Sequence, residues 1–506
     1  MSMKLFAAID IGSYEVEMKI FEIAPRKGIR ELDCVCHRME LGKDAYRMGK
    51  ISVEMVEELC EVLQDFVTIM KSYRVDDYRV CATSAVRETK NRTILLDYIK
   101  RHTGLEVEVL GNSAQRFMDY KSIASRENEF NTIIQKGTAI VDIGGGSVQI
   151  SLFDKDKLVA TQNMRIGNLR LRERMMNAGV SLKQYETILT EVIKKELLSY
   201  KKLYLKDRLI QNLIVVGDHI GDVVQKTVMS KEEFMAFYED VIYRSDEDVA
   251  ERYEAPEDII SVLRPSLVIY RCFIEETDVE NIWMPGLHLT DGMAYEYAQE
   301  NKILKSGHDF DEDILAAARN AAKRYQCSKS HIRMCEDLAV HIFEKTRKLH
   351  GLGMRERLLL RIAVILHGCG KFISLSNAGE CAYNIIMSMD IIGLSKEEKE
   401  IIANVAKYNT VPFVDYEQIG SNSLITRDNY LVIAKLAAIL RIVNSLDLSH
   451  KQKFKETKMT LRERELVINI SSDDDLSLEK KEFAEKAAFF EEVFSVKPVI
   501  HQKRIL

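Results

Sequence analysis

The sequence is organised around residues 139–152, which read Ala-Ile-Val-Asp-Ile-Gly-Gly-Gly-Ser-Val-Gln-Ile-Ser-Leu. An apolar run that contains Asp142, then three glycines and a serine, then alternating apolar residues predict a strand, a tight turn and a second strand. Because glycine has no Cβ, such a turn can bring backbone N–H groups close to an anion. The Asp142 carboxylate suits a divalent cation or an attacking water. A plain hairpin has the same pattern, so this stretch alone leaves both interpretations open.

A second copy of the pattern lies near the N-terminus. Residues 7–13 read Ala-Ala-Ile-Asp-Ile-Gly-Ser, and the apolar residues Val16, Met18 and Ile20 alternate after them. Asp10 in this copy corresponds to Asp142 in the other. Two units of strand, Asp, Gly, Ser and strand favour two similar lobes that face one phosphate-binding cleft over a plain hairpin.

Length and composition set the class of protein. With 506 residues, we expect about three or four domains. A formal net charge of -6 argues against general nucleic-acid binding. No apolar run approaches the ~20 residues that span a bilayer, so we expect no membrane segment. Nine cysteines without metal-ligand spacing fit free thiols in a reducing cytoplasm, and the short N-terminal stretch does not resemble a signal peptide.

Residues 1–125 form the first predicted lobe. Alternation predicts strands at 6–10, 15–23 and 31–39, and helical spacing after the candidate N-cap Ser52 predicts a long helix. Further strands are expected at 78–82 and 106–110, and helices at 91–102 and 113–125. Ser84 and Arg87 follow the fourth strand and could donate to a phosphate. An N-cap with a surface arginine explains the same residues equally well.

The second lobe is predicted over residues 126–306 and repeats the plan. Strands are expected at 137–143, 148–153, 157–164, 212–217 and 281–284, and helices at 182–203, 231–243, 262–273 and 294–299. Residues 217–221, Gly-Asp-His-Ile-Gly, follow the fourth strand as a third turn that faces the cleft.

The pattern then changes to helices alone. Residues 307–455 are predicted as a separate helical domain, with helices at 314–325, 330–347, 354–367, 380–389, 396–408 and 430–446. Residues 456–506 return to strand, helix and strand at 465–470, 479–494 and 497–504, a small αβ appendage.

With these motifs in place, the sequence resembles the exopolyphosphatase/guanosine pentaphosphate phosphohydrolase (Ppx/GppA) family. The motifs that carry the resemblance lie, in order, at residues 10–13, 82–87, 142–147, 167–171, 349–353 and 446–450. The resemblance implies an α/β protein with two actin-like, ribonuclease-H-like lobes, followed by an all-α domain of the HD-phosphohydrolase type and the αβ appendage. It also implies action on polyphosphate or on the γ-phosphate of guanosine pentaphosphate, and a homodimer.

The site residues that the resemblance implies fall on these motifs. Asp10 and Asp142 would be catalytic and would bind Mg²⁺ in the cleft. The phosphate-binding set would be Gly12, Ser13, Ser84, Arg87, Gly144, Gly145, Gly146 and Ser147.

Several positions depart from the family pattern. Where the family carries two Glu after the strand at 106–110, the second being its catalytic base, this chain has Ser113 and Ala114. Gln149 stands where a Glu helps to bind metal. Neither Ser nor Ala accepts a proton from water at neutral pH, and a glutamine adds no negative charge to a Mg²⁺ site. The sequence also departs from the family pattern at Tyr14 and Glu15. A third departure is the bulky Ile220 inside the turn at residues 217–221.

The helical domain also lacks residues that the family pattern would use for catalysis. His331 and His367 occupy two places of an HD metal site, but Gly368 follows His367 where an Asp is expected, and Asn444 replaces a distal Asp. Two histidines without carboxylates make a poor divalent site. We therefore expect no catalytic metal in this domain.

Three functions remain open from the sequence. The first is an impaired family member that binds polyphosphate or a guanosine penta- or tetraphosphate and acts as a sensor or regulator. The second is an active phosphohydrolase whose acids are rearranged, with Asp218, Glu15 or Glu88 as candidates. The third is a dimeric scaffold without a ligand, which the intact glycine turn, Arg87 and both aspartates disfavour.

Overall fold

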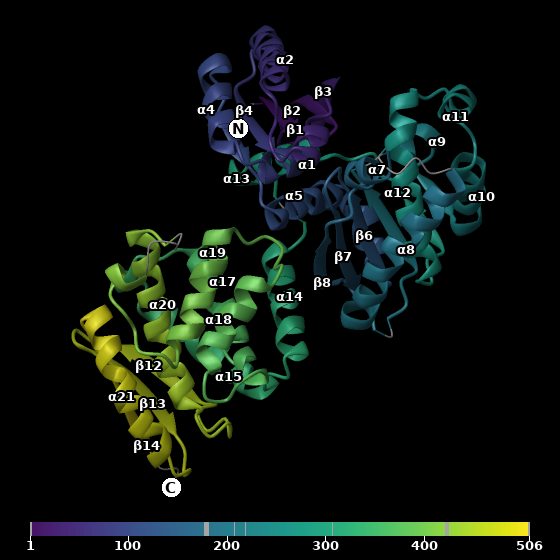
Figure 1. Cartoon of the computed structure of the whole chain (residues 1–506). Coiled ribbons are helices and arrows are strands. Elements are labelled where there is room, and N and C mark those ends of the chain that lie inside the picture. Colours follow the sequence, from purple (N-terminus) through teal and green to yellow (C-terminus); the bar gives the residue numbers. More distant parts are fainter. Residues whose placement is uncertain are drawn as a thin grey trace. The chain divides into compact units, whose positions relative to one another are not determined.

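The computed structural model describes residues 3–176, 182–206, 208–217, 219–305, 307–419 and 425–503 (Figure 1). The chain forms two compact units, Met1–Phe310 and Asp311–Leu506.

The first sheet of unit 1 has five strands in the order β3-β2-β1-β4-β5. Its strands are β1 (Lys4–Ile11), β2 (Glu15–Ala24), β3 (Gly28–Arg38), β4 (Asp77–Ala82) and β5 (Val107–Val109). The first three are antiparallel neighbours, and β4 and β5 run parallel to β1. These strands confirm the ones predicted from alternation, although β3 begins three residues earlier.

Both faces of this sheet are covered, which explains the alternation in β1. Ala7, Ile9 and Ile11 belong to a core with α2 (Val53–Tyr73) and α4 (Arg92–Thr103). Phe6 and Ala8 point the other way, into a core with α5 (Asn112–Ala124) and α13 (Leu289–Glu300). Side chains alternate between the two faces of a strand, so each face receives its own apolar set.

The second sheet repeats the plan of the first. Its order is β10-β11-β9-β6-β7-β8, with β6, β7 and β8 antiparallel and β9 and β11 parallel to β6. The bounds are β6 (Thr138–Ile143), β7 (Val148–Asp154), β8 (Lys157–Met164), β9 (Asn212–Val216), β10 (Val228–Ser230) and β11 (Asn281–Trp283). The lobe has one large core between this sheet and its helices. The two predicted actin-like lobes are confirmed.

The remaining helices of unit 1 are α1 (Leu41–Arg47), α3 (Ser84–Glu88), α6 (Glu127–Ile133), α7 (Asn168–Met176), α8 (Leu182–Tyr200), α9 (Ile220–Val224), α10 (Lys231–Ile242), α11 (Asp246–Tyr253) and α12 (Glu257–Glu275). The helix predicted at 182–203 ends at Tyr200 and continues as a wider π turn, Lys201–Leu205. Ser52 is the N-cap of α2, but its hydroxyl donates to Asp44 Oδ2 (2.6 Å) instead of capping.

Unit 2 is helical with a small sheet at its end, as predicted. Its helices are α14 (Phe310–Arg324), α15 (Lys329–Lys345), α16 (Arg347–His350), α17 (Met354–Leu366), α18 (Ala378–Ser388), α19 (Lys396–Tyr408), α20 (Arg427–Leu446) and α21 (Ser477–Phe494), with short 3₁₀ turns at Cys369–Phe372 and Tyr416–Ile419. The sheet order is β12 (Thr457–Leu461), β13 (Glu465–Ser471) and β14 (Lys497–Lys503). The sequence analysis did not predict β12. The four domain boundaries stay a prediction.

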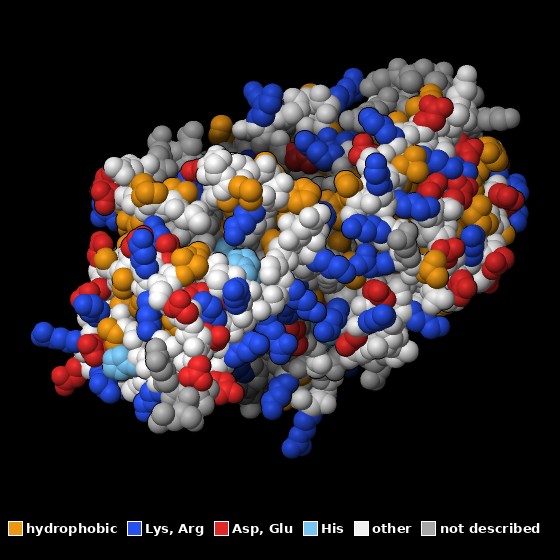
Figure 2. Space-filling view, turned by 90° about the horizontal axis from the view of Figure 1, so that it is seen from below, with side chains coloured by type: hydrophobic (Ala, Val, Ile, Leu, Met, Phe, Trp, Pro, Cys, Tyr) orange, Lys and Arg blue, Asp and Glu red, His pale blue; other side chains and the backbone are white. Residues whose placement is uncertain are grey.

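Of the described helices, α20 alone has the length and apolar composition that could span a membrane. Its apolar residues, among them Ile433, Leu436, Ile439 and Leu440, are buried within unit 2. It is therefore a core helix. On the face shown in Figure 2, Lys and Arg side chains occur together with Asp and Glu side chains.

A group of buried charges fixes α13 to the first sheet. Glu17 of β2 lies 3.0 Å from His288 Nδ1 and accepts a hydrogen bond from Thr290 (2.7 Å). Lys19 of the same strand pairs with Asp291 at 3.0 Å. The chain thus returns to the first lobe after building the second sheet. No local pattern in residues 288–300 indicates this, because the partners are more than 270 positions away.

The Glu17–His288 pair predicts a defined pH window of stability. Although burial opposes the charged forms, the hydrogen bond and the opposite charge lower the pKa of Glu17 to about 2 and raise the pKa of His288 to about 9. The histidine contribution is complete below its ordinary pKa of 6.5 and is lost as pH rises through about 9. The contribution of Glu17 to stability is complete above its ordinary pKa of 4.5 and is lost as the pH falls through about 2.

We expect His288→Gln to lower the melting temperature most between about pH 4.5 and 6.5 and hardly at all near pH 10. Thermal unfolding of wild type and variant across this range measures the difference. His501→Gln, at an exposed position of β14, is the control and should leave the profile unchanged. A difference that does not vary with pH would contradict the charged pair.

Candidate functional site between the two lobes

The two aspartates predicted to be catalytic occupy equivalent places in the two sheets. Asp10 is the next-to-last residue of β1 and pairs across the turn with Glu17 of β2. Asp142 is the next-to-last residue of β6 and pairs with Gln149 of β7. The repeated strand–turn–strand unit therefore presents one acid from each lobe.

The glycine turn after β6 packs directly on the first lobe. A Cβ on Gly145 would lie 2.7 Å from Ser13 Cβ, and one on Gly146 would lie 2.5 Å from Tyr46 Oη and 3.1 Å from Ser84 Cβ. Real Cβ atoms do not approach other atoms so closely, and only glycine fits here. The triplet thus serves the close approach of the two lobes.

Three hydroxyl groups of the first lobe form the surface on which this turn lies. The oxygens of Ser13 and Tyr46 are 2.7 Å apart, and each lies 2.9 Å from the Ser84 oxygen. Tyr46, on α1, is also stacked under the Arg170 guanidinium, 4.5 Å from the ring centroid. Sequence reasoning singled out Ser13 and Ser84 but missed Tyr46, which lies 33 residues from its nearest site partner in the chain.

The turn backbone is held by the chain around it. The N–H groups of Gly12 and Gly144 donate to the carbonyls of Glu15 and Ser147, each at 3.0 Å. The motif at residues 167–171 also contacts the glycine turn, since Arg170 N donates to Gly145 O at 2.9 Å. Gly12 and Gly144 thus close their own turns in this state, and their role as phosphate donors stays a prediction.

Arg87 lies on α3, and its guanidinium reaches the junction between β5 and α5. Its Nη1 donates to Leu110 O (2.6 Å) and Gln115 Oε1 (3.2 Å), and its guanidinium makes no other hydrogen bond to the described residues. Burial lowers its pKa. Arg87 therefore holds the start of α5, where Ala114 stands, with donor groups left over for a ligand.

The structure adds a third acid that the sequence analysis missed. Asp119 on α5 is only 5% exposed and hydrogen-bonds with Asp142. Burial, followed by the charges of Asp142 and Asp10, raises its pKa well above the usual range. Burial, followed by Glu17 and Glu15, does the same for Asp10. The sequence feature that could have indicated Asp119 is an acidic residue between Met118 and Tyr120, two buried residues of the same helix, five residues after Ala114.

The amide of Gln149 completes this group. Its Nε2 donates to Asp142 Oδ2 at 3.1 Å, and Gly217, with φ of +77°, leaves room for Asp142 Oδ1 where a Cβ would come within 2.3 Å. Within the described residues no three His, Cys, Asp or Glu side chains are arranged as a metal site. Oxygen donors of this kind suit Mg²⁺, which in proteins commonly takes one or two carboxylates and completes its shell with water and substrate phosphates. Asp10 and Asp142 fit that role.

The alternative acids named from the sequence have other partners. Glu88 pairs with Arg165 (2.8 Å) and Arg170 (2.7 Å). Glu15 accepts a hydrogen bond from Cys36 and lies 3.8 Å from His219. Asp218 lies outside the described residues. Ile220 is buried in the core of the second lobe, so its side chain does not fill the site.

The site residues are covered in this arrangement of the lobes. Ser13, Ser84, Asp142, Ser147 and Gln149 are each at most 6% exposed. Asp10 and the glycines Gly144 and Gly145 are, by contrast, partly exposed, so the site is covered on one side only.

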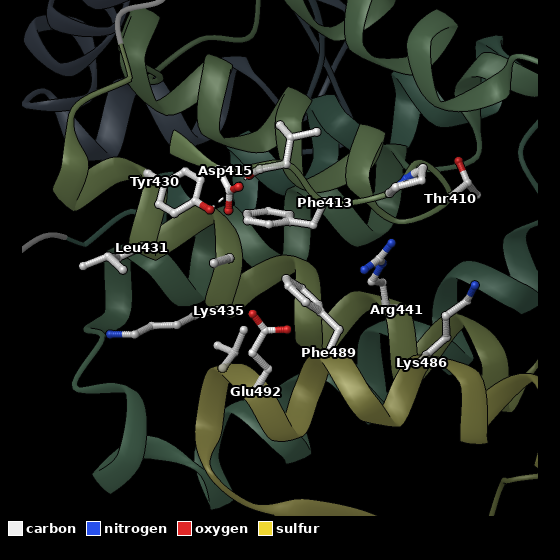
Figure 3. Close-up of a pocket in the computed structure, with 14 residues that line it drawn as sticks. Thr410, Phe413, Asp415, Tyr430, Leu431, Lys435, Arg441, Lys486, Phe489 and Glu492 are labelled. Carbon is white, nitrogen blue, oxygen red and sulfur yellow. Dashed lines mark hydrogen bonds between the residues drawn. The ribbon is translucent and has the colours of Figure 1, made fainter. Parts of the chain in front are cut away.

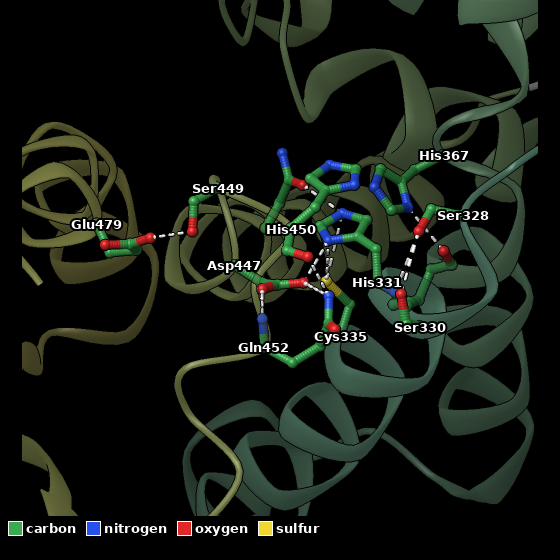
Figure 4. Close-up of polar contacts among 12 residues, drawn as sticks. Ser328, Ser330, His331, Cys335, His367, Asp447, Ser449, His450, Gln452 and Glu479 are labelled. Atoms are coloured by element: carbon green, nitrogen blue, oxygen red, sulfur yellow. Dashed lines mark hydrogen bonds and ion pairs between the residues drawn. The ribbon is translucent and has the colours of Figure 1, made fainter. Parts of the chain in front are cut away.

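The histidines of the helical unit form a hydrogen-bonded cluster (Figure 4). His331 lies 2.8 Å from Asp447 Oδ2 through Nδ1 and 3.1 Å from Asn444 Oδ1 through Nε2, and its ring stacks on His450 at 3.9 Å. Both nitrogens of His331 are thus engaged, whereas a metal needs one of them. Burial and the neighbouring His331 lower the pKa of His367 to about 4.

Two lobes that each present an aspartate beside a glycine or serine turn, followed by a helical unit, define a two-lobed actin-like protein. Comparison with known proteins identifies it further. The Ppx/GppA phosphatase family matches residues 27–237, and domain III of the Ppx/GppA phosphatases matches residues 315–486. The chain belongs to the Ppx/GppA phosphatase family.

Similar proteins agree with this assignment. The guanosine-5'-triphosphate,3'-diphosphate pyrophosphatase of Photobacterium profundum is 22% identical over 80% of both chains, and that of Aeromonas hydrophila is 22% identical over 87% of this chain and 86% of its own. Among solved structures, an exopolyphosphatase from Cytophaga hutchinsonii aligns with a TM-score of 0.53 at 18% identity, over 60% of this chain and all of that one. The Aquifex aeolicus family member aligns with 0.50 at 20%, over 61% and 100%.

We expect the helical unit to hold no stoichiometric Fe, Mn or Zn, because both ring nitrogens of His331 are hydrogen-bonded and Gly368 supplies no carboxylate. Elemental analysis of the full-length protein and of His331→Ala should give the same low content. Asp142→Ala serves as the control for metal held between the lobes. About one equivalent of metal that is lost only in His331→Ala would contradict the prediction.

Proposed function

We propose that this protein binds polyphosphate or a guanosine penta- or tetraphosphate between its two lobes, hydrolyses it poorly, and acts as a sensor or regulator. The family assignment and the names of its relatives support the ligand class. The paired aspartates, the serine hydroxyl groups and Arg87 supply the groups that a phosphate chain needs.

The observation that carries the impairment is the chemistry beside Asp142. At the two places where the family has glutamates, this chain has the methyl group of Ala114 and the neutral amide of Gln149, which donates to Asp142. A positioned general base typically contributes ~10²–10⁴ in rate. Ala114 has no group that could take the proton of an attacking water.

Mg²⁺, held by Asp10 and Asp142, would polarise the phosphoryl oxygens and neutralise part of their charge. The rest of the chemistry falls to the chain. Arg87 would orient the bound anion with charged hydrogen bonds, and Ser13 and Ser84 would donate to its oxygens. Closure of the glycine turn on Tyr46 would exclude water from the bound ligand.

An active phosphohydrolase with rearranged acids is the second candidate, and Asp119 is the observation that favours it. Its carboxyl group lies beside Asp142 on the same helix as Ala114. Burial and the neighbouring carboxylates raise its pKa, which disfavours the ionised form that a general base needs. Impairment is therefore the better supported of the two functions.

We also infer a cytoplasmic homodimer with no nucleic-acid partner. The inference of a dimer rests on the family resemblance alone. All nine cysteines are free thiols, as expected in a reducing compartment.

Arg87→Ala should weaken binding of polyphosphate or pppGpp about tenfold or more, since a charge-assisted hydrogen bond is worth about 1.5–3 kcal/mol. Calorimetry on the full chain measures the affinity. Arg92→Ala, at an exposed arginine on α4, is the matched control and should bind as wild type does. Unchanged affinity in a folded Arg87→Ala variant would argue against this site.

For catalysis, we expect phosphate release from polyphosphate by the wild type to be far below that of a family member with both glutamates. Ala114→Glu combined with Gln149→Glu should raise turnover more than either change alone, because base and metal act on the same water. Asn112→Glu, two residues before position 114 on α5, controls for added charge.

The opposite outcome is equally informative. Strong Mg²⁺-dependent turnover by the wild type that is lost in Asp142→Ala would overturn the proposed impairment. If Asp119→Asn also removed it, Asp119 would be identified as the substitute acid.

A further inference from the structure

A pocket of about 620 Å³ lies within unit 2, away from the two-lobed site (Figure 3). The chain after α19, helix α20 and helix α21 form its walls. A volume of this size is typical of sites for small organic ligands. None of the family motifs falls on it.

Two cations, Arg441 and Lys486, line one end of the pocket. Arg441 Nη2 donates to Val411 O at 2.9 Å, but its Nε is buried without a hydrogen-bond partner. No carboxylate of the described residues pairs with this guanidinium. Lys486 is partly balanced by Glu482, which lies 3.0 Å away on the same helix.

A partly buried guanidinium without a carboxylate partner is costly. Burial lowers the pKa of Arg441, because it disfavours the charged form. The carbonyl of Val411 satisfies one N–H and the ring of Phe489 lies 4.9 Å from the guanidinium, but no anion of the described residues balances the charge. A phosphate would supply both the charge and the missing acceptor, since guanidinium and phosphate form paired hydrogen bonds.

Aromatic rings line the middle of the pocket. Phe413 and Phe489 have centroids 4.9 Å apart, and Phe413 also lies 5.4 Å from Tyr430. In Figure 3, the rings of Phe413 and Phe489 lie between Arg441 at one end and Tyr430 and Asp415 at the other. Flat aromatic surfaces next to a phosphate site are what a nucleobase needs for stacking.

We propose that this pocket binds a nucleoside phosphate, with the phosphate on Arg441 and Lys486 and the base against Phe413 and Phe489. Inorganic phosphate would use the cations but leave the rings without a contact. A purely apolar segment of another chain would cover Arg441 without neutralising it. The site is separate from the one between the lobes, so it stands whether or not the proposed function does.

Photolabelling with 8-azidoadenosine 5′-monophosphate tests the site on the full-length protein. Mass spectrometry should place the label on peptides that contain residues 408–415 or 485–493. Arg441→Met and Lys486→Met should each reduce that label about tenfold, and Phe489→Leu should reduce it as well. Lys481→Met, an exposed lysine on the same helix α21 that does not line the pocket, should leave it unchanged.

Label on unit 1 peptides is counted separately, because it reports on the other site. The proposal is overturned if the unit 2 peptides stay unlabelled, or if Arg441→Met and Lys486→Met, with wild-type melting temperatures, label as strongly as wild type. It is also overturned if inorganic phosphate displaces the label as effectively as adenosine 5′-monophosphate, because the rings then contribute nothing. If Arg441→Met does not fold, Lys486→Met and Phe489→Leu decide the outcome.

Discussion

The close contact between the glycine turn of the second lobe and the hydroxyl groups of the first is the constraint on which unit 1 depends. Gly145 and Gly146 lie where any Cβ would overlap Ser13 or Tyr46. This contact brings the ends of β1 and β6 together and so sets Asp10 and Asp142 on the same site. The same contact covers Asp142, which is 5% exposed, whereas Asp10 stays partly exposed.

The acids brought together in this way explain why the site suits a cation. Asp10 and Asp119 have raised pKa values because burial and neighbouring carboxylates disfavour their charged forms. A bound divalent ion would reverse that preference, since it favours ionised oxygens. A glutamine at position 149, in place of a glutamate, would reduce the repulsion between carboxylates in the empty site. It would also reduce the attraction of the site for a divalent ion.

The sequence was sufficient for features that depend on neighbours in the chain. Alternation located β1, β2, β6 and β7, and the Asp–Gly–Ser pattern located both turns. It was insufficient where the partner is far away. Nothing in the local sequence distinguishes Asp119 from other polar helix residues; its role depends on the contact between α5 and β6. The role of His288 likewise depends on its pairing with Glu17 on the first sheet. Such pairs depend on how the two sheets are connected, and the local spacing of apolar residues carries no information about that connection.

In the helical unit, the buried His331 has protein partners for both ring nitrogens. Asp447 and Asn444 lie within hydrogen-bond distance of Nδ1 and Nε2. A network of this kind needs no ion, because each buried polar group has found a protein partner. Arg441 in the same unit differs, because no carboxylate of the described residues pairs with its guanidinium, which contacts only the carbonyl of Val411 and the ring of Phe489. A phosphate bound at the proposed nucleoside-phosphate site would balance this charge and accept the remaining hydrogen bonds.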